Sequence, residues 1–261
     1  MTDADTLFHI EPPLAFLTFN RPSTRNAMTW GMYDALVEAC ERVDRDDSVH
    51  VLVLRGAGGQ AFVAGTDISQ FQAFQTPADG VKYEGHITDV LDRLERVTKP
   101  TIAQIEGFAV GGGCAIAVAC DLRVATPESK FGVPIARTLG NCMAGTAFSR
   151  LVELVGPGRA KEILFTGRLV PAAEAFAIGL LNRVVPAAAI EGEVRGLAME
   201  IASNAPLTVR ATKEMTRRLM AFRRIASADA RDLIELCYGS ADFREGVTSF
   251  LTKRPPRWTG R

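Results

Sequence analysis

Three consecutive glycines, Gly111 to Gly113, are the residues in this sequence best placed to do chemistry, because they open a run of small apolar residues ending at Cys120. They follow an apolar run, Thr101 to Ile105, that is typical of a buried strand. Glycine allows a sharp turn there, and the first N–H groups of the following helix have no acceptor inside it. The helix dipole adds positive character at the same end. The sequence therefore predicts a helix N-terminus that stabilises a developing negative charge, with a plain packing turn as the alternative.

The elements that must position this turn are short apolar strands and amphipathic helices. The patterns predict extended segments at 14–19, 51–54, 122–125 and 180–185, and helices at 29–44, capped by Thr29, and 81–97. Between these, the polar, Gln-rich segment that ends at Asp79 predicts an irregular, mobile stretch. From residue 147 the pattern is mainly helical, with helices expected at 150–155, 159–165, 172–178, 190–203, 208–225, 227–238 and 243–251.

The pattern changes from mixed to all-helical near Ile190. We therefore expect an α/β core over residues 1–189 and a C-terminal helical subdomain over residues 190–261.

One glycine pattern imitates a dinucleotide site. Gly56, Gly58 and Ala61 follow a predicted strand with the spacing of the dinucleotide fingerprint. That fingerprint needs a helix to begin at the glycines, whereas residues 62–66 look extended and break again at Gly65. We expect no dinucleotide site here.

Composition excludes several classes of function. The 261 residues are 47% hydrophobic and carry no net charge, which argues against binding nucleic acid through bulk charge. No apolar run approaches the ~20 residues of a membrane span, and the acidic start does not resemble a signal peptide. Histidines 9, 50 and 86 are too scattered for a metal site. The five cysteines, at 40, 114, 120, 142 and 237, form no Cys-x-x-Cys pair, which favours reduced thiols in a cytoplasmic protein.

Several motifs together resemble the enoyl-CoA hydratase/isomerase (crotonase) superfamily over essentially the whole chain. No one of them is specific, but their joint order and spacing are. In chain order they are Arg21-Pro-x-x-x-Asn26-Ala27, Ala64-Gly-Thr-Asp-Ile68, Gly111-Gly-Gly-Cys114, Cys120-Asp-Leu-Arg123, Phe131-Gly-Val-Pro134, Gly167-Arg-x-x-x-Ala-x-Glu-Ala175, Gly179-Leu180, Arg244-Glu-Gly246 and Phe250-x-x-Lys-Arg254.

The resemblance implies an α/β, crotonase-like spiral of ββα units with C-terminal helices that assemble a homotrimer or a hexamer made of two trimers. It implies a coenzyme A thioester as substrate, no permanently bound cofactor and no metal. The thioester enolate would be stabilised by an oxyanion hole formed by the backbone N–H groups of Thr66 and Gly112. The positions that match coenzyme A contacts of the family are Arg25, Ala27, Ala64, Asp67, Ile68 and Lys253.

The sequence departs from the family at the two glutamates that hold and deprotonate water in its hydratases. Ala115 and Ile135 occupy these positions, and the neighbours Ala136 and Arg137 supply no carboxylate if the second alignment slides. Positioned acid–base groups contribute about 10²–10⁴-fold in rate. We therefore expect a reaction other than efficient hydration, with double-bond isomerisation, thioester hydrolysis and decarboxylation as candidates.

Other side chains could replace the missing glutamates. Glu84 and His86 lie near the edges of the apolar face of the helix that borders the acyl pocket in this family. Asn141 and Cys142 follow the second lost glutamate, but Cys142 has no nearby base in the sequence. Two alternatives stay open: a member that binds acyl-CoA without catalysis, and a standard hydratase with an unidentified acid–base group.

Overall fold

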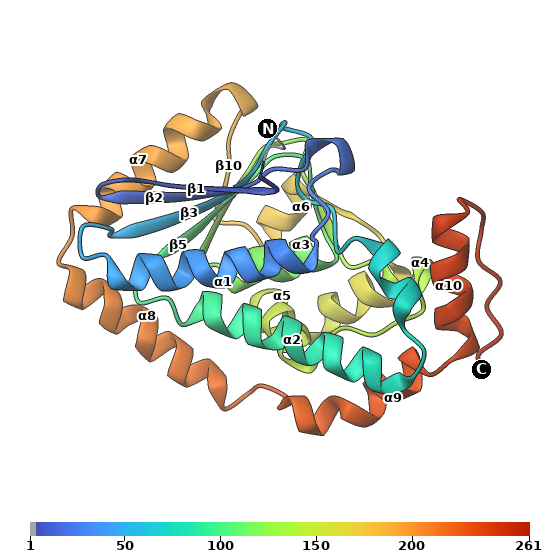
Figure 1. Ribbon diagram of the computed structural model, residues 1–261. Coiled ribbons are helices and arrows are strands. Elements are labelled where there is room, and N and C mark those ends of the chain that lie inside the picture. The colour runs from blue at the N-terminus through green and yellow to red at the C-terminus, as the bar shows by residue number, and fades with distance from the viewer. Residues whose placement is uncertain (1–3) are drawn as a thin grey trace.

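A six-stranded, mainly parallel β-sheet is the central layer of the fold (Figure 1). The computed structural model describes residues 4–261. Only the first two strands of this sheet run antiparallel to each other. The sequence analysis missed the first strand, whose side chains alternate between half-buried and exposed because it lies at the sheet edge. In spatial order the strands are β1 (Thr6–Glu11), β2 (Leu14–Phe19), β3 (Val51–Gly56), β5 (Thr101–Ile105), β7 (Leu122–Ala125) and β10 (Arg183–Val184).

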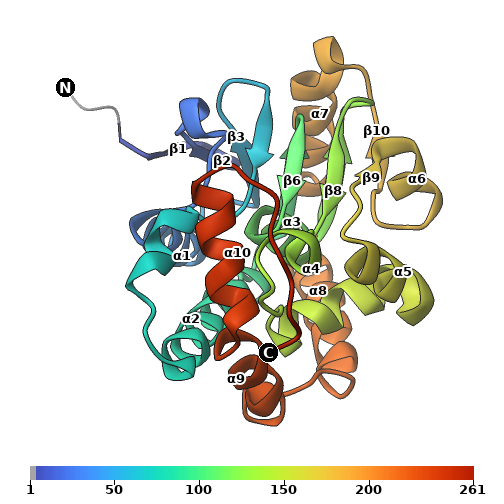
Figure 2. The same cartoon turned by 90° about the vertical axis from the view of Figure 1, so that its right-hand side faces the viewer.

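A second sheet of four short strands lies across one end of the first (Figure 2). Its strands are too short to show a hydrophobic period. The sequence analysis described residues 62–66 as extended, which overlaps the first of them, and predicted none of the other three. In spatial order they are β4 (Ala61–Val63), β6 (Phe108–Val110), β8 (Lys130–Gly132) and β9 (Val170–Pro171).

The chain repeats one unit three times. It adds a strand to the large sheet, a strand to the small sheet and then a helix, giving β3–β4–α2, β5–β6–α3 and β7–β8–α4. This arrangement confirms the predicted α/β spiral of ββα units. In the second and third units it also places the end of the small-sheet strand next to the start of a helix, where the pocket described below forms.

Helices cover both faces of the large sheet. The predicted cap is confirmed, because Thr29 accepts a hydrogen bond from Met32 N at the start of α1. The first three helices lie on one face, and α7 packs on the other, against strands β2, β3, β5 and β7 (Figure 1). The ten α-helices of the described chain are α1 (Trp30–Arg45), α2 (Pro77–Glu95), α3 (Gly112–Ala119), α4 (Ile135–Thr138), α5 (Gly145–Thr166), α6 (Ala172–Ala177), α7 (Ile190–Ala202), α8 (Pro206–Ala221), α9 (Arg231–Tyr238) and α10 (Ala241–Leu251).

One local expectation was wrong and another was confirmed. The segment expected to be irregular forms a 3₁₀ helix, Ile68–Ala73, and then begins α2 at Pro77. Asp67 accepts hydrogen bonds from Ser69, and Phe71 is buried, so local capping and one aromatic side chain outweigh the polar composition. The two helices expected at 150–155 and 159–165 are confirmed, because the helical backbone of α5 is interrupted at Gly156, which has a non-helical φ of 78° before Pro157.

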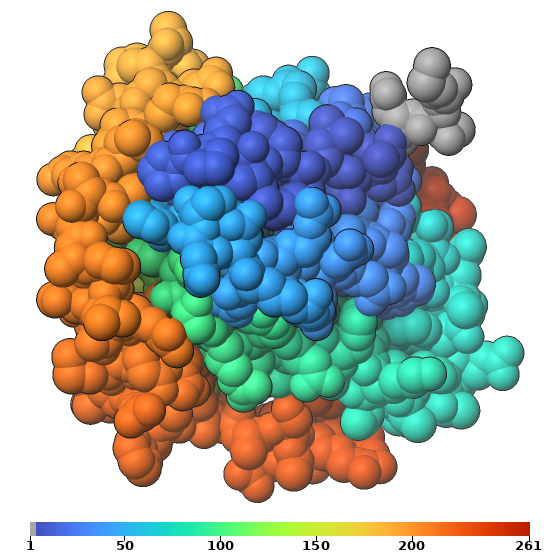
Figure 3. All heavy atoms as spheres, turned by 60° about the vertical axis from the view of Figure 1, so that its left-hand side comes forward, coloured from blue at the N-terminus to red at the C-terminus, as the bar shows by residue number. Residues whose placement is uncertain are grey.

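The C-terminal helices run along one side and the lower edge of the molecule (Figure 3). No side chain of α8 is buried, whereas α9 packs on α2 of the core. Helix α7 contacts strands of the large sheet, and α9 contacts α2, so both helices pack on elements that precede residue 190. The division into a core over 1–189 and a helical subdomain over 190–261 therefore stays a prediction. Among residues 4–261, no helix has the length and apolar character that crossing a bilayer requires.

Candidate functional site

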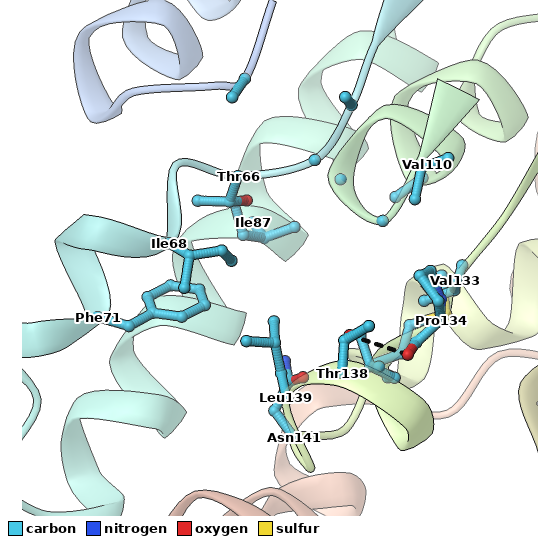
Figure 4. A pocket seen from close by; sticks show the side chains of 18 of the residues that line it. Thr66, Ile68, Phe71, Ile87, Val110, Val133, Pro134, Thr138, Leu139 and Asn141 are labelled. Atoms are coloured by element: carbon cyan, nitrogen blue, oxygen red, sulfur yellow. Dashed lines mark hydrogen bonds between the residues drawn. The ribbon is translucent and has the colours of Figure 1, made fainter. Parts of the chain in front are cut away.

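A cavity of about 400 Å³ lies where the 64–68 turn, α2, the N-terminus of α3 and the loop around α4 meet. In Figure 4, Thr66, Ile68, Phe71 and Ile87 line one side, and residues of the α4 segment line the other. Most of the lining is apolar, which suits an acyl chain. The principal apolar lining residues are Ile68, Phe71, Ile87, Val110, Ala115, Val133, Ile135, Leu139, Met143, Ala147 and Phe250.

Two residues of the cavity lining, Thr66 and Gly112, carry unbonded backbone N–H groups. A Cβ placed on Gly112 would lie 3.7 Å from Thr66 N, so the two residues are neighbours in space although 46 positions separate them. Within residues 4–261, neither N–H donates to a protein acceptor. Gly112 begins α3, where the helix leaves its first N–H groups unbonded. Two free donors side by side can stabilise one oxyanion.

Glycine is required at this turn for steric reasons. Gly111 has a φ of 55°, which L side chains rarely adopt. A Cβ on Gly113 would lie only 2.0 Å from Val63 O. The facing 64–68 turn is held by hydrogen bonds from Met28 N to Gly65 O and from Asp67 N to Met28 O.

Glu84 is a buried carboxyl group on the wall of this cavity, with 5% of its surface exposed. The Tyr238 hydroxyl donates a hydrogen bond to its Oε1 and accepts one from Asn141 Nδ2 at 3.1 Å. Burial raises the pKa of Glu84 to about 7, while the hydrogen bond from Tyr238 opposes this rise by stabilising the carboxylate. A carboxyl group with this pKa can both accept and return a proton near neutral pH.

The other carboxylate on the cavity wall, Asp67, is already engaged. It accepts hydrogen bonds from Ser69 and lies 3.3 Å from the guanidinium of Arg21. Burial favours its neutral form, but these partners outweigh burial and lower the pKa of Asp67. We infer that Asp67 holds the 64–68 turn to the first loop and does not move protons.

Five of the six predicted coenzyme A positions line the cavity: Arg25, Ala27, Ala64, Asp67 and Ile68. Arg25 has a backbone φ of 53°. Its side chain is exposed at the mouth of the cavity, and its guanidinium lies 5.2 Å from the ring centre of Phe108. Lys253 is exposed beyond the end of α10 and is not part of the lining.

His86 does not line the cavity, although the sequence placed it beside Glu84 as a candidate acid–base residue. Its ring packs edge-on against Trp30 and Tyr33. The helical period explains this difference, because side chains two residues apart on α2 point in directions ~200° apart. Of the two candidates, Glu84 therefore faces the cavity and His86 does not.

Ala115 and Ile135 both line the cavity, so the positions of the two missing glutamates do face the site. Cys142 also lines it, but its interaction with Cys237 and its burial raise the pKa of the Cys142 thiol above the ordinary range. The thiol therefore stays protonated and is a poor nucleophile. Within residues 4–261, no three His, Cys, Asp or Glu side chains are grouped as a metal site requires.

Sequence patterns missed three contributors to the site. Tyr33 contacts the hydroxyl of Thr66, Tyr238 binds Glu84, and Phe250 closes the cavity from α10. Tyr238 and Phe250 lie more than 150 residues from Glu84 in the chain. No local pattern reports contacts at such separations.

The family model for enoyl-CoA hydratase/isomerase matches residues 9–261 of this chain. The chain belongs to this family. Its members are enzymes that act on acyl-CoA thioesters, as the two unbonded N–H groups over an apolar cavity lead us to expect.

Individual members of the family align over nearly their whole length. A crotonyl-CoA hydratase from Syntrophomonas wolfei is 37% identical, over 94% of this chain and 94% of its own. The crystal structure of an enoyl-CoA hydratase/carnithine racemase from Magnetospirillum magneticum is 35% identical, with a TM-score of 0.81 over 100% of this chain and 97% of its own. A methylmalonyl-CoA decarboxylase in complex with 2-nitronate-propionyl-CoA is 26% identical, with a TM-score of 0.90 over 99% of both chains.

The structure of this chain also shows why the glycine pattern at 56–61 is not a dinucleotide site. The segment after Gly58 enters strand β4 and begins no helix, and a Cβ on Gly56 would lie 2.2 Å from Ala61 O. These glycines therefore allow two pieces of backbone to approach each other.

Proposed function

We propose that this enzyme forms the enolate of an acyl-CoA thioester and that Glu84 moves the proton. The thioester oxygen binds between the N–H groups of Thr66 and Gly112, and the acyl chain lies along the apolar wall of the cavity. The carboxylate of Glu84 removes a proton next to the thioester and later returns one. The observation that carries this proposal is that Glu84 is the only carboxyl group on the described wall of the cavity that has no ion-pair partner.

A single acid–base group suits double-bond isomerisation best. Starting from a β,γ-unsaturated acyl-CoA, the Glu84 carboxylate takes a proton from the α-carbon, and the electrons of the broken C–H bond are delocalised onto the thioester oxygen as a dienolate. The same carboxyl group then protonates the γ-carbon, which gives the α,β-unsaturated thioester. In the reverse direction the proton leaves the γ-carbon of the α,β-unsaturated thioester and returns to the α-carbon. No water enters the product, so the second glutamate of a hydratase is unnecessary. We therefore propose an acyl-CoA double-bond isomerase and place hydration second.

Decarboxylation is a further candidate because of the structural likeness to the methylmalonyl-CoA decarboxylase. Loss of carbon dioxide would generate the same enolate in the same oxyanion hole. Formation of propionyl-CoA from methylmalonyl-CoA, detected by chromatography, would distinguish this reaction from isomerisation.

Binding and proton exchange test the proposal together. Because ligand at 100 times its dissociation constant stabilises a fold by about 2.7 kcal/mol, saturating butyryl-CoA is expected to raise the melting temperature. In deuterium oxide, the enzyme is expected to exchange the α-protons of butyryl-CoA for deuterium. Mass spectrometry of butyryl-CoA measures this exchange. An unchanged melting temperature would contradict the acyl-CoA site. Stabilisation without any exchange would favour a member that only binds acyl-CoA.

We also propose assembly into trimers, alone or paired as hexamers. The C-terminal helices expose large apolar side chains that the described chain leaves uncovered, among them Leu207, Met215, Leu219, Phe222 and Leu236. Phe222 is 93% exposed, and burying such side chains between copies is favourable. Light scattering at micromolar concentration is expected to give three or six times the chain mass of 28.2 kDa. A stable monomer would contradict the assembly.

The cytoplasmic location stays a prediction. It is consistent with Cys40, Cys114 and Cys120, which are free and buried in the structure. Burial raises the pKa of Cys40 to about 12 and that of Cys114 to about 11, so these thiols are unreactive.

A further inference from the structure

The loop after α4 carries Asn141 on the wall of the cavity (Figure 4). Gly140 turns the chain just before it, with a φ of 70°. A Cβ on Gly140 would lie 3.2 Å from the backbone of Asp242 in α10, so glycine lets the loop pack closely against that helix. From this position Asn141 reaches Tyr238: its Nδ2 lies 3.1 Å from the Tyr238 hydroxyl.

The contacts of Asn141 fix which way its amide points. Nδ2 faces both the Tyr238 hydroxyl and the backbone carbonyl of Cys142, which lies 3.4 Å away. A carbonyl oxygen can only accept a hydrogen bond, so the group that faces it is the NH₂ and not Oδ1. The reverse orientation would bring two acceptors face to face. Asn141 is therefore a hydrogen-bond donor to Tyr238.

This donor leaves one direction for the proton of Tyr238. Tyr238 is buried, and within residues 4–261 its hydroxyl bonds only to Asn141 Nδ2 and Glu84 Oε1. Because Nδ2 is itself a donor, the proton of Tyr238 lies toward Glu84. Donation from Asn141 also polarises the hydroxyl and strengthens its bond to Glu84. A carboxylate accepts such a bond more strongly than a neutral carboxyl group does, so the chain of bonds favours ionised Glu84.

The arrangement has a cost at Asn141. Its Oδ1 is buried, and none of the described residues donates a hydrogen bond to it. Turning the amide over would let Tyr238 donate to Oδ1, but the Tyr238 proton would then leave Glu84. An unpaired buried acceptor is unfavourable, and in native structures such a group calls for an explanation such as a role in a catalytic site. The observed orientation gives up a hydrogen bond at Asn141 and keeps one at Glu84.

We propose that Asn141 is a positioning residue, which acts through Tyr238 to hold a hydrogen bond on the Glu84 carboxylate, so that Glu84 meets the substrate as a base. This inference rests on the proposed function, in which Glu84 moves the proton. It adds to that function a residue that does not itself exchange the proton.

Other titratable groups also face Glu84, and one of them changes charge in the same pH range. They are Tyr33 on α1, Tyr83 on α2, Cys142 in the loop before α5 and Cys237 on α9. Burial raises the pKa of both tyrosines, to about 12 for Tyr33, and the pKa of Cys142 is also raised, so these groups stay neutral. The interaction with Cys142 lowers the pKa of Cys237 to about 7. A Cys237 thiolate would raise the pKa of Glu84, so the test needs a variant without this thiol.

The test is a double-mutant cycle read out by pH. Asn141→Leu removes the amide at similar size, Tyr238→Phe removes the hydroxyl, and the double variant removes both. Two midpoints are measured: that of the pH profile of α-proton exchange in butyryl-CoA, and that of the infrared band of the protonated Glu84 carboxyl group in the free enzyme. Glu84→Gln identifies this band by its loss. The whole series is repeated with Cys237→Ser.

Asn141→Leu is expected to move both midpoints to higher pH by about 0.5–1 pH unit, the equivalent of one ordinary hydrogen bond. Adding Asn141→Leu to Tyr238→Phe is expected to move them no further, because the path from Asn141 to Glu84 is already cut. Thr138→Val is the matched control. Thr138 lines the same wall, but its hydroxyl donates to Pro134 O, so this variant should leave the midpoints in place whatever it does to the rate.

An unchanged midpoint in Asn141→Leu would overturn the inference. Equal movements with and without the Tyr238 hydroxyl would also overturn it, because Asn141 would then act on Glu84 directly. Asn141→Ala removes the same amide without filling its space, and it gives the reading if Asn141→Leu does not fold. Failure of the proposed function looks different: wild type exchanges no proton, or Glu84→Gln exchanges as fast as wild type, while the infrared midpoint still reports on Asn141.

Discussion

Replacing Glu84 by glutamine is expected to slow α-proton exchange in butyryl-CoA by about 10²–10⁴-fold, the usual contribution of a positioned acid–base group. Glutamine keeps the shape of the side chain and can still accept a hydrogen bond from Tyr238, so the cavity and acyl-CoA binding should be retained. Mass spectrometry of butyryl-CoA in deuterium oxide measures the rate. Asp89→Asn is the matched control, because Asp89 is an exposed carboxylate on the same helix. Equal rates for wild type and Glu84→Gln would show that another group moves the proton.

The pH profile gives an independent signature of Glu84. A base must be ionised before it accepts a proton, so the wild-type exchange rate should rise with pH and level off above about 7, the pKa that burial gives Glu84. Tyr238→Phe removes a donor that stabilises the carboxylate, so the pKa of Glu84 should rise and the midpoint of the profile should move to higher pH. A midpoint that moves to lower pH, or stays in place, would contradict this role of Tyr238.

Hydration of crotonyl-CoA is expected to be slower by about 10²–10⁴-fold than in a family member that carries both glutamates, equivalent to ~3–5 kcal/mol of barrier. Ala115 and Ile135 line the cavity where water must be held and deprotonated, and neither can do so. Losing both groups need not double the effect of losing one, because residues acting as a unit are not additive. Loss of the absorbance of the conjugated thioester measures the rate.

Restoring the carboxylates tests the cause. Ala115→Glu with Ile135→Glu should raise hydration, and Ala115→Gln with Ile135→Gln is the control for added bulk without acid–base chemistry. Ala115 is 4% exposed, so the melting temperature of each double variant must show that it folds before its rate is compared. Wild-type turnover of crotonyl-CoA as fast as that of a two-glutamate enzyme would show that Glu84, or another group, performs hydration unaided.

Local sequence patterns determined much of the fold because they report interactions within one element. Three glycines after an apolar run predicted the turn into α3, and Thr29 predicted the start of α1. The order of weak motifs predicted the family, which the family model confirms over residues 9–261. Strands of three residues, such as β6 and β8, escaped notice because they are shorter than any recognisable period.

What the sequence determined by itself is the family, the alternation of strands and helices and the absence of carboxylates at positions 115 and 135. It also predicted Thr66 and Gly112 as the oxyanion donors, which stays a prediction. Only the tertiary structure decided between Glu84 and His86, because the helix turns one toward the cavity and the other toward Trp30 and Tyr33. It also brought Tyr238 to Glu84 across 154 positions and brought the hydroxyl groups of Tyr33 and Tyr83 to that of Thr66. The physical reason is that a pKa and a donor direction depend on burial and on hydrogen-bond partners, and folding supplies both from distant parts of the chain.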